Sequence, residues 1–368
     1  DRPFSAPEAE LYEPQLNKSF DYVQSLLDIL SHENIASREP IFEKYDKQVQ
    51  GRTYIESGLG NSGILAPFNS SKYPQEIRMV GVAISTDHNP SYSLISPYWG
   101  GVNAVAESMR NVSASGATPH AITDCLCFGN PEKPNQMWEF VESTRGIMDA
   151  CNAITLKDHP DTPTPIIAGN VSFYNESKSG PIPPSPIVSC LGRLKNVKYS
   201  LSMNLQRPDS LLIMLGKRKD ELGGSVFYSL QNELGANVPK PNLEECKKQI
   251  FAITDCAEKN LVLSCHDISD GGIATALTEM TFKNNIGISV HIDSTMEPYK
   301  VLFSETGGFI LEFDPRNEQD IVSIFNKYSL KFYHIGKTGG KSIRLNGKIE
   351  LSIEKAKQFW KDGLREKL

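Results

Sequence analysis

The feature that most constrains this fold is an alternation of apolar runs and amphipathic segments between residues 76 and 194. The run "MVGVAIS" predicts a strand, and the segment "GGVNAVAESMRNVSASG" predicts a helix because its apolar residues recur at helical spacing. The predicted strands are 79–85, 120–129, 166–172 and 187–194, and the predicted helices are 100–116 and 134–154. The order strand-helix-strand-helix-strand-strand is typical of an α+β, ferredoxin-like unit.

A second unit follows a boundary predicted at 195–208. It begins with the strand "SLLIMLG" and ends with a helix at 353–367. Further helices are predicted near 222–234, at 242–259 and after Asp270, and further strands at 261–268, 286–292, 308–313 and 331–336. We therefore divide the chain into a linker with N-terminal helices, an α+β domain and a C-terminal α/β domain, at 1–50, 51–195 and 196–368.

Bulk composition excludes several classes of partner. A chain of 368 residues is long enough for two domains. Its net charge of -6 argues against binding to nucleic acid or to an anionic membrane, and it has no apolar run of transmembrane length. The seven cysteines include no CxxC pair, which indicates reduced thiols and a cytoplasmic location. Cys125 and Cys127 share one face of a predicted strand. We interpret them as small buried hydrophobic residues, and a metal-binding pair is the less favoured alternative.

Polar residues crowd the end of the first strand in "AISTDHNPSY". Side chains at the end of a covered strand often contact a ligand. Asp87 is therefore a candidate to bind a ribose, an adenine amino group or a metal ion. The alternative is a plain Asx-turn before Pro90.

A second candidate is "IIAGNVSFYNE", residues 166–176, which we interpret as a buried strand although strands usually avoid Gly and Asn. Gly169 permits close approach of a ligand, and Asn170 offers an amide oxygen to a hard cation. Ser172 projects from the same face as Asn170 and is placed to bond a phosphate oxygen. The alternative is a β-bulge with an internally satisfied Asn.

Two further segments are weaker candidates. Gly100 and Gly101 precede a predicted helix, whose free N–H groups are suited to phosphate, but the spacing matches no standard nucleotide motif. In "SCHDISDGGIATAL", His266 and Asp267 suit either catalysis or packing, and Asp270 suits a helix start. No HExxH, CxxC or Ser-His-Asp order is found.

Taken together, the segments resemble the phosphoribosylformylglycinamidine synthase family, within the aminoimidazole ribonucleotide synthetase superfamily. The matching pieces, in family order, are "SHENIASREPIFEKYDKQVQG", "VAISTDHNPSYSLISPYWGGVNAVAESMRNVSASGATPHAITDCLCFGNPEKP", "GNVSFYNES", "LGGSVFYSL" and "CHDISDGGIATALTEM". The resemblance implies an N-terminal α+β domain that forms half of a β-barrel with a partner, followed by a C-terminal α/β domain.

The resemblance also implies that this chain is the second half of a tandem synthetase. The family's first half carries a His-containing motif and acidic metal ligands, and neither is found here. No glutaminase pattern is found either, so the implied partners are the first half or a second copy of this chain, together with a glutaminase subunit or domain.

The implied activity is ATP-dependent amidation of formylglycinamide ribonucleotide in purine biosynthesis, with Mg²⁺ and ATP required. By resemblance Asp87 and Gly169 contact ATP, Asn170 binds Mg²⁺ and Ser172 contacts the ribonucleotide. No catalytic residue is expected in this half, which would be inactive alone. His88 and Cys127 occupy positions that are often Gly and Asn in the family.

The competing hypothesis is a homodimeric nucleotide-binding or structural module without catalysis of its own. Exposed sheet edges and apolar surface favour association, and a symmetric pair is its simplest form.

Overall fold

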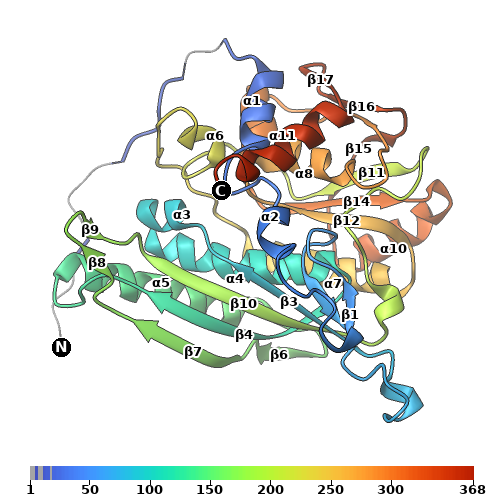
Figure 1. The fold of residues 1–368 in the computed structure, drawn as a ribbon, viewed down its shortest axis with the longest axis horizontal. Coiled ribbons are helices and arrows are strands. Elements are labelled where there is room, and N and C mark those ends of the chain that lie inside the picture. Colours follow the sequence, from blue (N-terminus) through green and yellow to red (C-terminus); the bar gives the residue numbers. More distant parts are fainter. Residues whose placement is uncertain (1–4, 7–10, 17–18) are drawn as a thin grey trace.

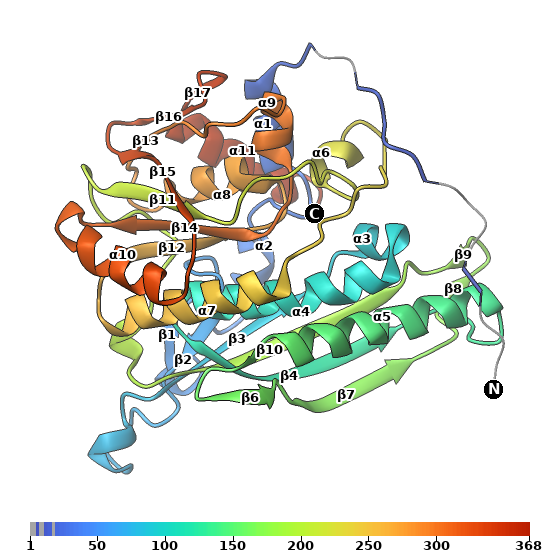
Figure 2. The ribbon, with the colours of Figure 1, turned by 180° about the vertical axis from the view of Figure 1, so that it is seen from behind.

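The computed structural model of the chain describes residues 5–6, 11–16 and 19–368. Two β-sheets and their helices are stacked in layers (Figures 1 and 2). The first sheet lies under helices α4 (Pro97–Ala114) and α5 (Pro134–Ala153), and helix α7 (Leu243–Glu258) packs on both of them. The second sheet follows, and helices cover its far side. The expected α+β fold class is confirmed.

The first sheet has the strand order β1-β2-β3-β10-β4-β7. All of its ladders are antiparallel except β4 with β7, which run parallel on either side of the α5 crossover. Its strands are β1 (Thr53–Ile55), β2 (Gly63–Leu65), β3 (Gly81–Asp87), β4 (Thr118–Cys127), β7 (Ile166–Ser172) and β10 (Ser185–Leu194). The glycine-rich segment 51–67 thus contains a short β1–β2 hairpin.

The two faces of this sheet differ in cover. One face packs on α4 and α5 and contributes buried residues such as Ala83, Ile122 and Val188 to a core. On the other face Ile84 is 45% exposed and its cross-strand neighbour Leu191 is 37% exposed. In both views helices α4 and α5 lie together on the other side of the sheet (Figures 1 and 2). We call the face that carries Ile84 and Leu191 the open face.

Strand β7 is an exposed edge strand, which corrects our interpretation of a buried strand. Every residue from Ile166 to Val171 is exposed, and β7 pairs only with β4. Its ladder contains a bulge, because Ile122 pairs with Ile166 while Thr123 pairs with Ala168, so Ile167 is an extra residue. The apolar composition suggested a core strand, but the strand lies at the rim of the sheet.

The second sheet has the order β12-β14-β11-β15-β13-β16-β17 and is antiparallel except between β13 and β16. Its strands are β11 (Leu211–Leu215), β12 (Val262–Ile268), β13 (Ile288–Val290), β14 (Gly308–Phe313), β15 (Phe332–Thr338), β16 (Ser342–Leu345) and β17 (Ile349–Ser352). Strand β14 is buried along its whole length, as expected of a central strand. The sequence did not predict β16 and β17.

Helices on the far side of the second sheet join the N-terminal segment to the C-terminal unit. Helix α1 (Tyr22–Leu30) packs against α8 (Gly272–Met280) and α11 (Ile353–Arg365). The remaining helices are α2 (Glu39–Phe42), α3 (Pro90–Ile95), α6 (Val226–Ser229), α9 (Pro298–Phe303) and α10 (Glu318–Lys327). Part of the linker predicted within 1–50 lies outside the described residues. The helix predicted at 222–234 is reduced to the single turn of α6.

Short strand pairs and 3-10 turns lie in the connections between these elements. Short strand pairs are β5 (Thr155–Leu156) with β6 (His159–Pro163), and β8 (Glu176–Ser177) with β9 (Gly180–Pro181). Turns of 3-10 helix occur at Val49–Gly51, Gln75–Ile77, Val197–Tyr199 and Pro315–Asn317. In the described part of the chain, no helix is both long and apolar enough to span a membrane.

Candidate functional site

Asp87 ends strand β3 on the helix-covered side of the first sheet. Its Oδ2 accepts a hydrogen bond of 2.7 Å from Nδ2 of Asn111 on α4. Burial raises the pKa of Asp87, the Asn111 hydrogen bond opposes that rise, and the nearby charge of Asp267 adds to it. Asn89, not Asp87, caps the following helix α3 by accepting from the N–H groups of Ser91 and Tyr92. Asp87 therefore faces the interior, between the two domains.

A cavity of about 260 Å³ lies at this position. Besides Asp87 and Asn111, its lining includes the acidic residues Glu107, Asp267, Asp270 and Glu279 and the histidine His266. Burial also raises the pKa values of Glu107 and Asp270, and the carboxylates near them add to both rises. The cavity thus concentrates carboxyl groups contributed by both sheets and by α4.

Two cations offset this negative charge. Arg110, which is 3% exposed, lies 3.6 Å from Glu107 and 3.9 Å from Asp267. Burial alone would lower the pKa of His266, but hydrogen bonds with Asp267 and Glu279 outweigh burial and raise it to about 9. His266 is therefore a cation at neutral pH. The residues His266 and Asp267, which suited either catalysis or packing, belong to this internal charge network.

The glycine pair after Asp270 is held by a buried carboxylate. Gly271 and Gly272 both have positive φ, and the N–H of Gly271 donates to Glu305 Oε1 at 2.8 Å. The other oxygen of Glu305 accepts from the Tyr92 hydroxyl at 2.5 Å. Asp270 accepts from Asn89 Nδ2 at 3.3 Å. The motif "SDGG" thus joins the two domains at the start of α8.

The second candidate region lies at the edge of the sheet, where Gly169 stands opposite Asp124. A Cβ atom on Gly169 would lie 2.7 Å from Asp124 Oδ1 and 2.8 Å from Oδ2, so any larger residue would displace that carboxylate. The backbone N–H of Asn170 also bonds to this carboxylate. Burial raises the pKa of Asp124, and the Asn170 hydrogen bond opposes that rise. The glycine therefore makes room for an acid on the neighbouring strand.

Asn170 projects from the open face. It pairs with Cys125, and its Nδ2 lies 3.8 Å from Cys125 Sγ, so its amide oxygen points away from that thiol. Ser172 lies on the same face, opposite Cys127, but its hydroxyl bonds to the Asn175 side-chain oxygen at 3.2 Å. Strand β7 also contains a β-bulge, as the alternative interpretation expected, but the extra residue is Ile167 and not Asn170.

The structure does not bring Asp87 and Asn170 together. One row of paired residues crosses the sheet through Asp87, Val188, Asp124 and Gly169. Side chains in one row point to the same face, and the next residue points to the opposite face. Asn170 therefore faces away from the side that carries Asp87, and three strand spacings separate them. The ATP contact expected of Asp87 and the Mg²⁺ contact expected of Asn170 therefore point to opposite faces of the sheet, which contradicts a single cleft for both, and Asp124 points to the same face as Asp87.

The donors at the edge strand are compatible with a hard cation held mainly by a nucleotide. Mg²⁺ commonly takes one or two protein oxygens and completes its shell with phosphate oxygens and water. Asn170 supplies one amide oxygen on an exposed strand. Among the residues that the structure describes, no three His, Cys, Asp or Glu side chains converge as a metal site. A metal ion bound here would therefore depend on the nucleotide for most of its ligands.

Two family models match this chain. The model described as "AIR synthase related protein, N-terminal domain" matches residues 76–194, and the corresponding C-terminal domain model matches residues 207–347. The chain is 44% identical over 363 residues to "Phosphoribosylformylglycinamidine synthase subunit PurL" of Methanothrix thermoacetophila. That match covers 97% of this chain and 46% of the relative. The chain thus spans about half the length of the curated relatives it matches.

Solved structures show a similar fold. "T. maritima PurL complexed with FGAR" superposes with a TM-score of 0.70 at 18% identity, over 91% of this chain and 53% of that one. "T. maritima PurL complexed with ATP" superposes with a TM-score of 0.63 at 21% identity, over 90% of this chain and 52% of that one. At these identities the likeness extends to the fold alone.

Proposed function

Because this chain belongs to the AIR synthase related protein family, we propose that it forms half of the synthetase part of a phosphoribosylformylglycinamidine synthase. That enzyme is an ATP-dependent C–N ligase that converts formylglycinamide ribonucleotide to the amidine. The observation that carries the proposal is 44% identity to a PurL subunit across 97% of the chain. The coverage of 46% of that relative supports a half-molecule. That the chain is the second half remains a prediction.

The chemistry requires two transfers. ATP phosphorylates the amide oxygen of the substrate, and ammonia then displaces phosphate to give the amidine. The protein's part is to align the reactants, neutralise phosphate charge and exclude water. Mg²⁺, when bound, would neutralise phosphate charge. We propose Asn170 as its ligand in this chain.

The edge strand carries the nucleotide-binding role in this proposal. Gly169 leaves room for the Asp124 carboxylate on the helix side of the sheet, and that carboxylate accepts the backbone N–H of Asn170, whose side chain lies on the open face. Ser172 is proposed to contact the ribonucleotide after its bond to Asn175 opens. A contact between Asp87 and ATP would require the nucleotide to enter the pocket between the two domains that Asp87 lines.

The open face explains why a half-molecule needs a partner. Its apolar residues include Leu65, Ile84 and Leu191, which are 37–45% exposed. Such a surface favours cover by a second sheet. We propose that the other half of the synthetase supplies it, that a glutaminase subunit or domain delivers ammonia, and that the assembly is cytoplasmic. Formylglycinamide ribonucleotide is the proposed substrate.

Reconstitution tests this proposal. The purified chain is given formylglycinamide ribonucleotide, Mg-ATP and ammonia, with and without the other half of the synthetase. We expect phosphate release that depends on the ribonucleotide only when both halves are present. The same assay with the other half alone is the control. Turnover by this chain alone, or an inert mixture of two folded halves that associate, would contradict the proposal.

The open face also favours a second candidate, a homodimer of this chain without catalysis of its own. Light scattering after size-exclusion chromatography distinguishes the two. A stable dimer that does not exchange with the other half supports the second candidate. A chain that leaves its self-associated form to join the other half supports the first.

A further inference from the structure

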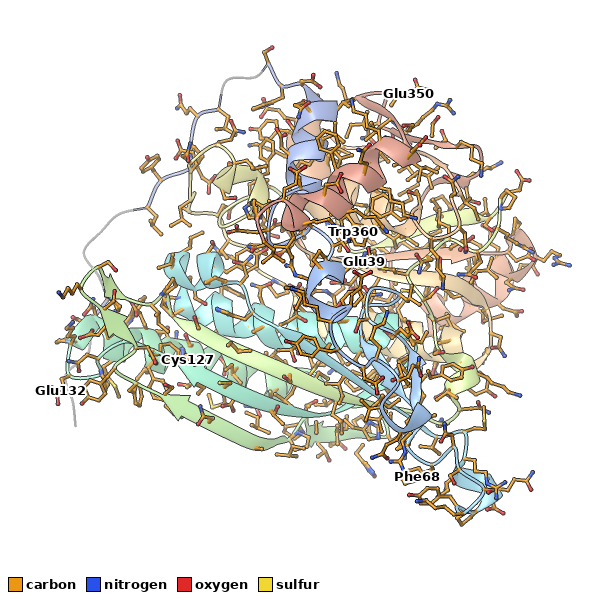
Figure 3. The ribbon with its side chains drawn as sticks, viewed as in Figure 1. Glu39, Phe68, Cys127, Glu132, Glu350 and Trp360 are labelled. Atoms are coloured by element: carbon orange, nitrogen blue, oxygen red, sulfur yellow. The ribbon has the colours of Figure 1, made fainter. Side chains whose placement is uncertain are left out.

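Two cysteine side chains lie next to each other on the open face. Cys125 and Cys127 are two residues apart on β4, so both side chains project from the same face of the sheet. Their sulfur atoms are 3.8 Å apart. Both are partly exposed, whereas the other five cysteines are buried and all seven are free thiols. Figure 3 labels Cys127 on the first sheet. This placement corrects our interpretation of the pair as small buried hydrophobic residues.

The surroundings of the pair are polar on the side of the edge strand. Asn170 lies opposite Cys125 and directs its Nδ2 toward the sulfur at 3.8 Å. Ser172 lies opposite Cys127 on the same strand. An amide and a hydroxyl oxygen therefore flank two soft donors.

The sulfur separation fits chelation of a tetrahedral metal ion. Zinc–thiolate bonds of about 2.3 Å at the tetrahedral angle place two sulfurs about 3.8 Å apart. The pair has that spacing before any metal binds. A disulfide, by contrast, requires sulfurs about 2.05 Å apart and would pull two positions of one extended strand together. The geometry is suited to chelation more than to oxidation.

We propose that Cys125 and Cys127 form a binding site for a soft, thiophilic divalent cation of the zinc and cadmium class. Binding converts two thiols and one M²⁺ into two metal–thiolate bonds and releases two protons. Water completes the coordination, with the Asn170 amide oxygen as a further donor once that amide rotates. A soft ion here would occupy the place next to Asn170 and so compete with a hard cation at that residue.

The experiment uses the purified 368-residue chain and Cd²⁺ as the probe, because metal–thiolate bonds absorb in the ultraviolet. We expect one Cd²⁺ per chain, a thiolate charge-transfer band and release of two protons. Cys127→Asn should weaken binding by about tenfold or more and reduce the band, as loss of one of two metal ligands does. Cys151→Ala, which removes a buried thiol, is the matched control and should leave both unchanged.

A second measurement keeps the test decisive. Zn²⁺ should protect two thiols from alkylation, and peptide mapping should assign them to Cys125 and Cys127. Circular dichroism checks that each variant is folded. Equal Cd²⁺ affinity for the chain and Cys127→Asn, or protection of other cysteines, would overturn the site. The assay requires no enzymatic turnover, so its failure would leave the proposed synthetase function standing.

Discussion

The two faces of the first sheet differ in how many partners their side chains have within the protein. On the helix side, Asp87 and its neighbouring carboxyl groups are buried or half-buried and lie near Asn111, Arg110 and His266. On the open side, Asn170, Cys125 and Ile84 face outward with few internal partners. Residues one position apart on a strand thus occupy different chemical environments. The helix side is suited to holding two domains together, and the open side to contact with other molecules.

The strongest challenge to this contrast is removal of the buried cation. Arg110→Met leaves Glu107 and Asp267 without their guanidinium partner, and breaking a buried ion pair typically costs about 3–5 kcal/mol. We expect a clear decrease in the denaturant midpoint. Arg193→Met, which breaks the exposed pair with Asp158, is the control and should cost about 1 kcal/mol or less. Equal losses of stability in the two variants would show that the buried network stabilises the fold no more than the exposed ion pair does.

The pH dependence of stability tests the same network. The pKa of Asp87 is raised from an unfolded value of about 3.9 to about 7, so between these values the folded state binds more protons than the unfolded state. Its stabilising contribution is complete below pH 4 and is lost as pH rises through 7. Asp87→Asn should flatten that decline by up to about 1.4 kcal/mol per pH unit.

Measurements of nucleotide binding by the assembled enzyme test whether Asp124 or Asp87 matters more for binding Mg-ATP. Asn170→Ala and Asp124→Asn should each weaken Mg-ATP binding by about tenfold, because they alter the proposed metal ligand or the carboxylate bonded to its backbone. Asp87→Asn should have a smaller effect. Calorimetric titration measures all three. A larger loss for Asp87→Asn than for Asp124→Asn would restore Asp87 as the nucleotide contact.

The smallest expected effect on stability comes from the open face itself. Ile84→Lys places a charge where the side chain is already 45% exposed, so the unfolding free energy should change by about 0.5 kcal/mol or less. Association with the other half, or with a second copy, should weaken because a charge would be buried in the contact. Sedimentation velocity reports the association. An unchanged association constant would mean that another surface makes the contact.

Much of the first domain was predictable from periodicity. Helices α4 and α5 and strands β3, β4 and β10 lie within a few residues of their predicted positions, because each has one clearly apolar face. Helices α9 and α10 and strands β16 and β17 were missed. The domain boundaries remain predictions. They lie outside the ranges matched by the two family models.

The candidate site was only partly predictable. Gly169, Asn170 and Ser172 were singled out from an unusual strand composition, but Asp124, the carboxylate opposite Gly169, was not predicted. A strand–helix–strand unit normally places its two strands close together and parallel, so the segment containing Asp124 was available as the neighbour of 166–172. The sequence could not show that "IIAGNV" is exposed. An apolar strand that is covered by its own chain has the same composition as one that is covered by another chain.

The bulge at Ile167 determines which way the whole edge strand faces. Thr123 pairs with Ala168 only because Ile167 is skipped, and this offset sets Gly169 opposite Asp124 and Asn170 opposite Cys125. If Ile167 took the place opposite Thr123 instead, every later side chain would exchange sides, and the Asn170 amide would turn toward the helices. Regular pairing of the same sequence would thus invert the chemistry of the strand while leaving each functional residue in the chain. Deletion of Ile167, by contrast, would remove the bulge and leave Gly169 opposite Asp124 and Asn170 opposite Cys125.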